Sequence, residues 1–246
     1  MLVVVIILIA LFGAFVRTVF GFGEALVTMP LLALVGFKLS SATALIGALG
    51  LLVALPATIR SRAHIDFAVV RRLVLGSLIG VPIGILLLKL VPTRLILQLF
   101  GLFLISYGSY QLWQLWRGKP KKARLQAARW DYLAGLISGA LGSAYNSHGV
   151  PVVIYGTLKR WPVNQLRGIL QAHFVCVGVI VVSSQVAAGF WNGEVVRLLL
   201  IIIPLLAVVI PFGNWLSSRI PQATLVKYIY LLLVIFGGLL VFKSLN

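Results

Sequence analysis

An arginine and a glutamate, seven positions apart, interrupt strongly apolar sequence near the amino terminus. Arg17 lies inside an apolar run that begins at residue 2, and Glu24 follows the segment Gly21-Phe22-Gly23. Seven residues are close to two turns of an α-helix, which would put both side chains on one face. An unpaired cation in apolar surroundings is costly. Arg17 therefore either pairs with Glu24 or faces a cavity where it meets an anion, and Glu24 is either a structural partner or a proton carrier or gate.

A second group of polar residues lies in the other half of the chain. Asn146, Ser147 and His148 stand together in a glycine-rich segment, residues 142–149. Their side chains can hydrogen-bond an anion, and a protonated histidine also attracts one. His148 is either a site residue or a satisfied interior histidine, whereas Asn146 and Ser147 either line a cavity or form a polar seam between helices. Thr28, after the first glycine-rich segment, can also help to bind an anion. On a predicted helix in the second half, three further residues either line the same cavity or form a polar seam between helices: Gln165, Gln171 and His173.

Other chemistries have less support in the sequence. No Gly-x-x-x-x-Gly-Lys-Ser/Thr element is present, so no ATP motor of the P-loop kind is expected. The His and Cys residues lack zinc-site spacing, and four acidic residues argue against a carboxylate metal site, so we expect no metal and no cofactor. An intramembrane hydrolase that pairs Ser147 or Ser183 with His148 or His173 is a weaker alternative, because no nucleophile motif surrounds either serine.

The composition shows what kind of element must position these residues. Hydrophobic residues make up 61% of the chain, charged residues make up 10%, and the mean hydropathy is +1.10. Soluble globular chains carry roughly 25% charged residues, so we expect an all-α integral membrane protein surrounded by lipid. The net charge of +17 comes from basic residues in short gaps between apolar runs. That placement is typical of membrane topology signals and not of a nucleic-acid-binding face, so nucleic acid is not an expected partner.

Apolar runs predict the membrane helices. A helix needs about 20 apolar residues to cross the hydrocarbon core. Two pieces, residues 25–35 and 150–158, are too short to cross, and each follows a glycine-rich segment. Glycine permits tight turns, and interrupted backbone at membrane depth persists only inside protein or beside a cavity. Eight longer runs are predicted to span the membrane: 2–20, 41–59, 73–90, 95–116, 132–145, 163–188, 195–216 and 223–242.

The chain is also an internal repeat. An offset of 121, which becomes 129 further on, superimposes glycines and prolines in the same order, which is hard to obtain by chance. We therefore divide the chain into a first transmembrane repeat (residues 1–116), a basic linker (117–130) and a second transmembrane repeat (131–246). The equivalent positions share a residue type: Gly21 and Gly142, Pro30 and Pro151, Lys38 and Lys159, Pro82 and Pro211, and Pro92 and Pro221.

The distribution of Lys and Arg predicts how the two repeats face. When the linker is placed in the cytoplasm, fifteen basic residues lie on that side and five on the other, which satisfies the positive-inside rule. The equivalent residues Lys38 and Lys159 then lie on opposite sides of the membrane. The repeats are therefore predicted to be inverted, with both termini outside the cytoplasm and the protein in the inner cell membrane.

Inverted repeats with interrupted helices in corresponding positions are the architecture of secondary transporters. Substrate in such proteins sits near the bilayer midplane, where helix amino termini direct partial positive charge at an anion. The two short pieces supply such termini, at Ala25 and near Gly149. We therefore expect alternating access at a midplane site between the repeats. The predicted anion-binding residues are Arg17, Gly21, Phe22, Gly23, Glu24, Thr28, Asn146, Ser147, His148, Gln165 and His173.

The segments FGFGEALVTMPLL (residues 20–32) and ISGALG (137–142) resemble the TauE/SafE family of sulfite and organosulfonate exporters. Members have two related halves, each with an apolar helix, a glycine-rich break and an apolar piece that ends in proline. The resemblance covers nearly the whole chain and implies export of a small sulfur-containing anion such as sulfite or an organosulfonate. Proton-coupled anion uptake is the alternative. The chain has Glu24 where the family often has glycine, and Ala144-Tyr145-Asn146 where it has a glycine run. The sequence does not determine the oligomeric state, and a homodimer is one of the alternatives.

Overall fold

A computed structural model describes residues 2–117, 125, 127–219 and 222–245. Within this part the chain forms helices and no strand, which confirms the expected all-α fold. The helices in chain order are α1 (Leu2–Phe20), α2 (Glu24–Leu34), α3 (Leu39–Ser61), the 3₁₀ turn η1 (Arg62–His64), α4 (Phe67–Leu90), α5 (Thr93–Arg117), α6 (Arg129–Tyr145), α7 (Gly149–Lys159), α8 (Val163–Ala187), α9 (Gly193–Ser217) and α10 (Gln222–Leu245).

The long helices fit a membrane-spanning protein. Among the described residues, α1, α3, α4, α5, α8 and α9 are long and apolar enough to cross a membrane. The helices α2 and α7 have 11 residues each, as the two short apolar pieces predict. The chain is therefore a multi-pass membrane protein whose two shortest α-helices follow the glycine-rich segments.

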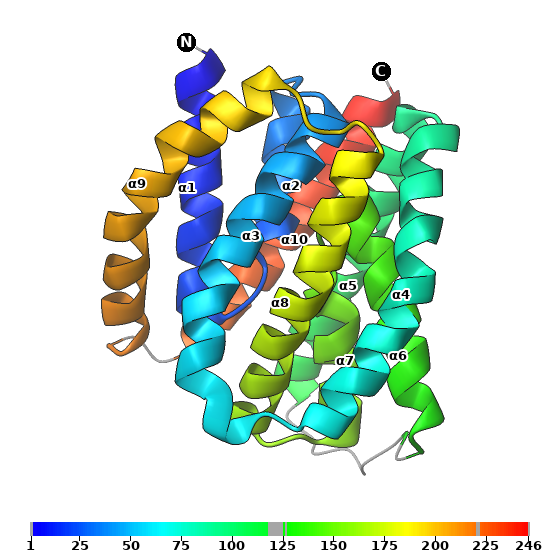
Figure 1. The fold of residues 1–246 in the computed structure, drawn as a ribbon, viewed down its shortest axis with the longest axis vertical. Helices are drawn as coiled ribbons and strands as arrows, with labels where there is room; N and C mark the ends of the chain where they lie inside the picture. The colour runs from blue at the N-terminus through cyan, green and yellow to red at the C-terminus, as the bar shows by residue number, and fades with distance from the viewer. Residues whose placement is uncertain (1, 118–124, 126, 220–221, 246) are drawn as a thin grey trace.

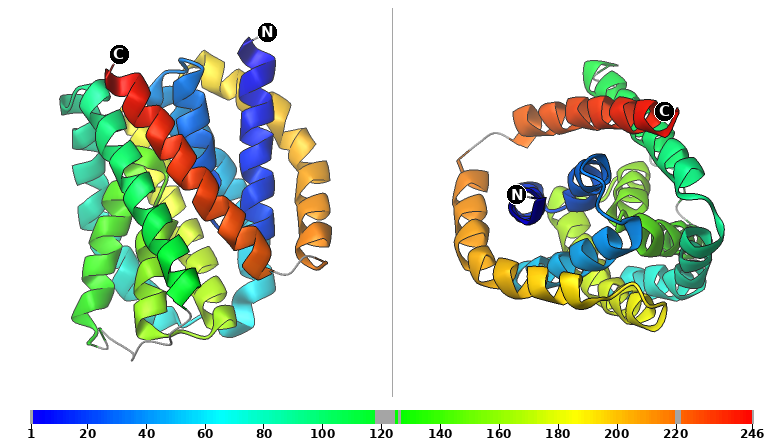
Figure 2. Two further views of the ribbon diagram at one scale, coloured as in Figure 1. Left: turned by 180° about the vertical axis from the view of Figure 1, so that it is seen from behind. Right: turned by 90° about the horizontal axis from the view of Figure 1, so that it is seen from above.

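The interrupted helices lie inside the bundle, and the long apolar helices surround them. Residues 24–30 of α2 are all buried, whereas Leu200 and Val208 of α9 are exposed. Viewed from above, α9, α10, α5 and α4 form an outer ring around α1 and α2 (Figure 2, right). Both termini lie at one end of the molecule, and α5 ends and α6 begins at the opposite end, which we call the linker end (Figure 1). Thus α1 and α6 enter the bundle from opposite ends.

Glycines bring α4 and α6 into backbone contact. A Cβ atom built on Gly80 would lie 2.0 Å from the carbonyl oxygen of Leu136, and one on Gly135 would lie 2.1 Å from the carbonyl oxygen of Leu73. The Ser77 hydroxyl donates to the Gly135 carbonyl across the same interface, at 2.8 Å. Because lipid tails are as apolar as leucine, membrane helices associate through such close packing and hydrogen bonding. The α4–α6 pair is therefore a rigid support beside the second interrupted segment.

A buried carboxylate ties the second half together at the linker end. Asp131, at the start of α6, is fully buried and accepts from Arg72 Nε at 2.6 Å and from Lys159 Nζ at 2.9 Å. The Tyr155 hydroxyl also donates to Asp131. Since Arg72 belongs to α4 and Lys159 ends α7, the network fixes the end of the short helix α7 to its neighbours.

The two breaks have different backbone geometries. In the first, Gly21 and Gly23 have φ values of 83° and 94°, which glycine adopts without steric cost. In the second, α6 continues through Gly142 and ends at Tyr145, and the next residue, Asn146, has a φ of 53°. Asparagine tolerates this left-handed conformation better than most residues. The second break is thus confined to Asn146, Ser147 and His148 and is shorter than the glycine-rich segment that predicted it.

Candidate functional site: two helix breaks and an arginine-lined cavity

The two interrupted segments lie against each other in the interior. A Cβ atom built on Gly149, at the start of α7, would lie 3.7 Å from Phe22 Cβ in the first break. A void of only about 10 Å³ separates the segments, and such a volume holds about one water molecule. The void is lined by Arg17, Phe22, Gly23, Glu24, Ala25, Leu26, Asn146, Ser147, Gly149, Val150 and Phe174.

Arg17 and Glu24 form a buried ion pair across the first break. Arg17 Nη1 lies 3.3 Å from Glu24 Oε2, and the two side chains are 5% and 2% exposed. Arg17 Nε and Nη2, and Glu24 Oε1, have no hydrogen-bond partner in the structure. The guanidinium carbon of Arg17 lies 4.2 Å from the ring centroid of Phe174 on α8, a cation–π contact. One carboxylate oxygen and an aromatic face therefore hold Arg17, while two of its N–H-bearing nitrogens are available to another acceptor.

A glycine on α3 makes room for the ion pair. A Cβ atom built on Gly50 would lie 3.2 Å from Glu24 Oε2 and 3.3 Å from Arg17 Nη1. Any larger side chain at this position would press on both charged groups. The polar pair is thus packed between the first break, α3 and α8.

Asn146 anchors the second break to α3. Its side-chain amide nitrogen donates to the carbonyl oxygen of Thr43, which fixes the orientation of the amide group. The amide oxygen then faces Gly47 and has no partner. The Ser147 hydroxyl donates to the Tyr145 carbonyl at 3.3 Å, so this hydroxyl is turned toward the end of α6.

Two buried histidines lie beside the second break. Their ring centroids are 6.4 Å apart, and the His148 ring packs edge-on against Phe174, at 4.7 Å. Ser138 on α6 donates to the His148 carbonyl at 2.6 Å, and its oxygen lies 2.7 Å from His173 Nε2. Since the only hydroxyl proton of Ser138 goes to the carbonyl, His173 Nε2 must carry a proton and donate to Ser138. Nδ1 of each histidine is left without a partner.

Thr28 and Gln165 do not join this site. The Thr28 hydroxyl donates to the Glu24 carbonyl at 2.8 Å, and its methyl group packs against Gly13. Gln165 lines a separate cavity at the linker end, together with His64 and Asp66. The structure therefore brings Arg17 and His173 together with the predicted residues of the two breaks. It places Thr28 and Gln165 outside this site.

Several residues near the breaks were not predicted. Phe174 contacts both Arg17 and His148. Ser138 forms hydrogen bonds with the His148 carbonyl and the His173 ring. Ser138 lies within the ISGALG segment, but a lone serine in a small-residue run carries no signal of such contacts. Gln185 on α8 also lies beside Asn146 at Gly47, with its side-chain amide nitrogen and oxygen both unpartnered.

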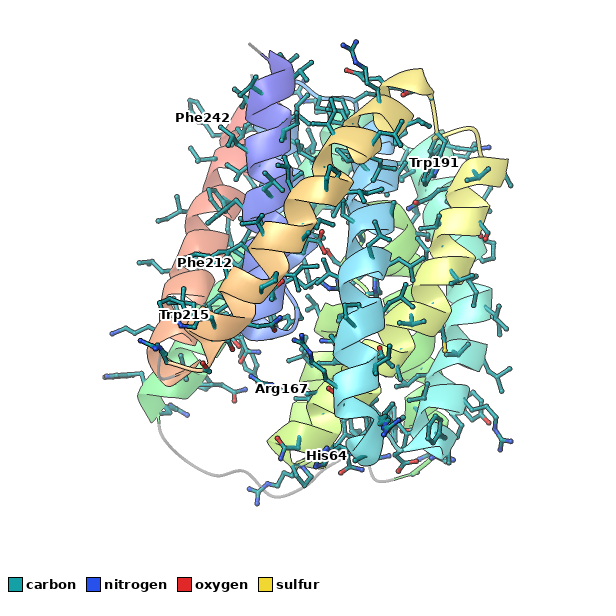
Figure 3. The ribbon with its side chains drawn as sticks, turned by 60° about the vertical axis from the view of Figure 1, so that its left-hand side comes forward. His64, Arg167, Trp191, Phe212, Trp215 and Phe242 are labelled. Carbon is teal, nitrogen blue, oxygen red and sulfur yellow. The ribbon has the colours of Figure 1, made fainter. Side chains whose placement is uncertain are left out.

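An arginine-lined cavity leads from the linker end to the first break. Its volume is about 220 Å³, and it is lined by Arg17, Arg60 and Arg167, with polar groups from Gln171, Asn214 and Ser217. Arg60 is exposed, whereas Arg17 is buried and also lines the small void between the breaks. Figure 3 places Arg167 toward the end that carries His64, away from Trp191. The Gln171 amide donates to the Gly21 carbonyl at 2.8 Å and so ties the first break to α8 at the floor of this cavity.

Comparisons with known proteins bear on these features. A family model described as sulfite exporter TauE/SafE matches residues 6–240. Searches of curated proteins and of solved structures give no match.

Proposed function

This chain belongs to the sulfite exporter TauE/SafE family, and on that premise we propose that it is a secondary transporter that exports small sulfur-containing anions such as sulfite or organosulfonates. The substrate would bind between the two helix breaks and reach both sides of the membrane by alternating access. The linker end would face the cytoplasm, in agreement with the distribution of basic residues.

The arginine-lined cavity is the observation that carries this proposal. Three arginines line it, and the innermost, Arg17, borders both the cavity and the void between the breaks. A guanidinium presents a planar fork of donors that matches an oxyanion, and two nitrogens of the Arg17 fork are unpartnered. The amino terminus of α7 at Gly149 adds partial positive charge beside the same void. An incoming anion would therefore compete with Glu24 for Arg17.

The sizes of the two spaces support an alternating-access cycle. The cavity of about 220 Å³ can admit a small anion, whereas the void of about 10 Å³ between the breaks cannot. In the proposed cycle this is the inward-facing, unloaded state. Substrate would enter from the linker end, separate Arg17 from Glu24 and occupy the widened space between the breaks. Rocking of the two halves, which enter the bundle from opposite ends, would then open the other side.

The membrane potential suffices to drive this export. An anion that leaves an inside-negative cell gains about 2.3 kcal/mol per 100 mV, which supports roughly a fortyfold gradient. No nucleotide-driven motor is needed for a monoanion.

Efflux from proteoliposomes tests the proposal. Vesicles that contain the purified protein and labelled sulfite are given an inside-negative potential with valinomycin and a potassium gradient. We expect protein-dependent sulfite efflux that increases with the membrane potential. Sulfonates should compete with this efflux, and Arg17→Gln should abolish it. Absence of protein-dependent flux for sulfite and for sulfonates alike would refute the proposed function.

Proton-coupled uptake is a second candidate, supported by the unpartnered Glu24 Oε1 and the two unpartnered histidine nitrogens. These atoms could accept protons next to the anion. The same vesicles distinguish the mechanisms. Uptake that is driven by an acidic exterior and lost in Glu24→Gln would favour coupled import, whereas flux that follows the potential alone would favour export.

A further inference from the structure

A groove on the lipid-facing surface lies outside the site described above. Helix α5 packs mainly on α10, and α6 packs mainly on α4, which leaves a groove along α6 and α7, with Phe103 of α5 and Leu125 also in its lining. Its volume is about 240 Å³, and its lining is apolar and aromatic. The residues that define its length and floor are Phe103, Trp130, Ile137, Leu141, Val150 and Leu158.

The dimensions of the groove match one chain within one membrane leaflet. From Trp130 to Leu141 the axis of α6 rises about 16 Å, which is about half of the hydrocarbon thickness. Trp130 marks the linker end of the groove, at the level where indoles usually meet headgroups. The groove volume of about 240 Å³ is too small to hold a helix of about 10 Å diameter from another protein. A single acyl chain is the occupant that fits.

The mouth of the groove carries positive charge. Arg129 is exposed, and its guanidinium carbon lies 5.5 Å from the Trp130 ring centroid. Arg117 ends α5 at the same end of the molecule and lies over Trp113, at 4.1 Å. In the predicted topology this end meets the cytoplasmic leaflet, which holds anionic lipids. We propose that the groove binds one acyl chain of an anionic phospholipid, with the headgroup at Arg129.

The proposed lipid would contact the moving part of the protein. Val150 and Pro151 line the deep end of the groove and directly follow Gly149, where α7 begins beside the void. The end of the acyl chain would therefore support the short helix α7 from the side opposite the substrate. Bound lipid would stabilise α7 in the position seen here.

Native mass spectrometry of the purified full-length protein tests the lipid site. The protein is delipidated and then mixed with phosphatidylglycerol or phosphatidylcholine of identical acyl chains. We expect the wild type to retain one phosphatidylglycerol. Ile137→Trp fills the groove from a side chain that is 43% exposed, and we expect it to lose that lipid. Leu200→Trp, at a 68% exposed position on α9 outside the groove, should retain it and serves as the matched control.

A second variant tests the headgroup. Each surface arginine contributes about 1 kcal/mol to binding of an anionic lipid, so Arg129→Gln should weaken retention of phosphatidylglycerol about fivefold. Arg62→Gln, at an exposed position of the same end, should not. Equal retention of the two lipids by the wild type would overturn the anionic-headgroup assignment.

Three results would overturn the groove as the lipid site. The first is unchanged lipid retention in a folded Ile137→Trp protein. The second is a dimer that Ile137→Trp dissociates while bound lipid stays constant, because a second copy would then be the occupant. The third concerns Leu133→Trp, at another exposed position in the groove, which replaces Ile137→Trp if that variant does not fold, as judged by helical circular dichroism. Unchanged lipid retention in Leu133→Trp would then overturn the groove as the lipid site.

Discussion

Arg17 Nη1 lies 3.3 Å from Glu24 Oε2 across the first helix break, with both side chains almost fully buried. Removing one partner of a buried ion pair leaves an uncompensated charge, which is far more costly than removing both. Stability and transport can therefore be separated at this pair by single and double substitutions.

Arg17→Gln is expected to lower the free energy of unfolding by about 3 kcal/mol, because Glu24 stays buried without its partner. The double variant Arg17→Gln with Glu24→Gln should regain most of that stability. If Arg17 binds the anion, flux stays at least tenfold below wild type in both variants, since 1.4 kcal/mol of lost binding is already tenfold. Denaturation in detergent and vesicle efflux measure the two properties. Normal flux in the stable double variant would remove Arg17 from the substrate path.

Gly50→Ala is predicted to disturb the ion pair without removing a charge. The added methyl group would lie 3.2 Å from Glu24 Oε2 and 3.3 Å from Arg17 Nη1, so the pair must shift to accept it. We expect anion efflux to fall severalfold. Gly178→Ala on α8 is the matched control, because its methyl group would meet Leu51 at an ordinary contact distance of 3.4 Å. Equal flux in the two variants would show that the position of the ion pair does not limit transport.

Arg60 and Arg167, at the outer part of the cavity, are expected to attract the anionic substrate into it. Clefts lined by one sign of charge raise the local concentration of counter-ions about tenfold or more. Arg60→Gln with Arg167→Gln is therefore expected to raise the KM for sulfite about tenfold while leaving the maximal rate unchanged. The difference from wild type should shrink at high salt, because exposed charges are screened.

Arg62→Gln is the control for the Arg60 and Arg167 substitutions, since Arg62 directly follows the cavity-lining Ser61 but does not line the cavity itself. A KM that rises equally in Arg62→Gln would indicate a general surface effect. A loss of maximal rate in the double variant would instead place Arg60 or Arg167 in the transport step.

The backbone plan could be read from the sequence because it depends on local properties. Apolar length predicted the helices, and among the described residues six of the eight predicted spans are long and apolar enough to cross a membrane. The first glycine-rich segment predicted where α1 would end. The pairing of Arg17 with Glu24 was one of the two alternatives, and the structure pairs them, although the break after α1 means that they do not share one continuous helix. The second break was predicted too long because one glycine in a helix costs only about 1 kcal/mol, so α6 continues through Gly142 to Tyr145.

Side-chain partners were harder to predict, because they depend on the position of each residue along its helix axis and on how neighbouring helices pack. Gln165 and His173 were expected on one helix face, but eight residues separate them by about 12 Å along the axis, so Gln165 lines the cavity at the linker end whereas His173 contacts Ser138 in the interior. Thr28 satisfies its hydroxyl on the preceding turn, which a sequence pattern does not reveal. The contacts of Phe174 depend on α8 packing beside both breaks, and an aromatic residue in an apolar run gives no such signal.

Gly80→Ala should disrupt the α4–α6 support. The new Cβ atom would lie 2.0 Å from the Leu136 carbonyl oxygen, so the two backbones must separate. Overpacking of this kind costs about 3 kcal/mol, which thermal unfolding in detergent can measure. Gly238→Ala on α10 is the control, because nothing lies within 4 Å of its added atom. Similar melting temperatures for the two variants would mean that α4 and α6 pack less closely than described here.

The orientation of the protein in the membrane can be tested with single cysteines. The native Cys176 is first replaced by serine, and a cysteine is then introduced at Ala127, beside the start of α6, or at Asn192, before α9. These positions lie at opposite ends of the bundle (Figure 1). The distribution of basic residues predicts that an impermeant maleimide added to intact cells labels the cysteine at 192 and not the one at 127. Disrupting the membrane should expose both, which controls for reactivity. The reverse pattern would put the arginine-lined cavity on the outer side, and the proposed direction of substrate entry would then be wrong.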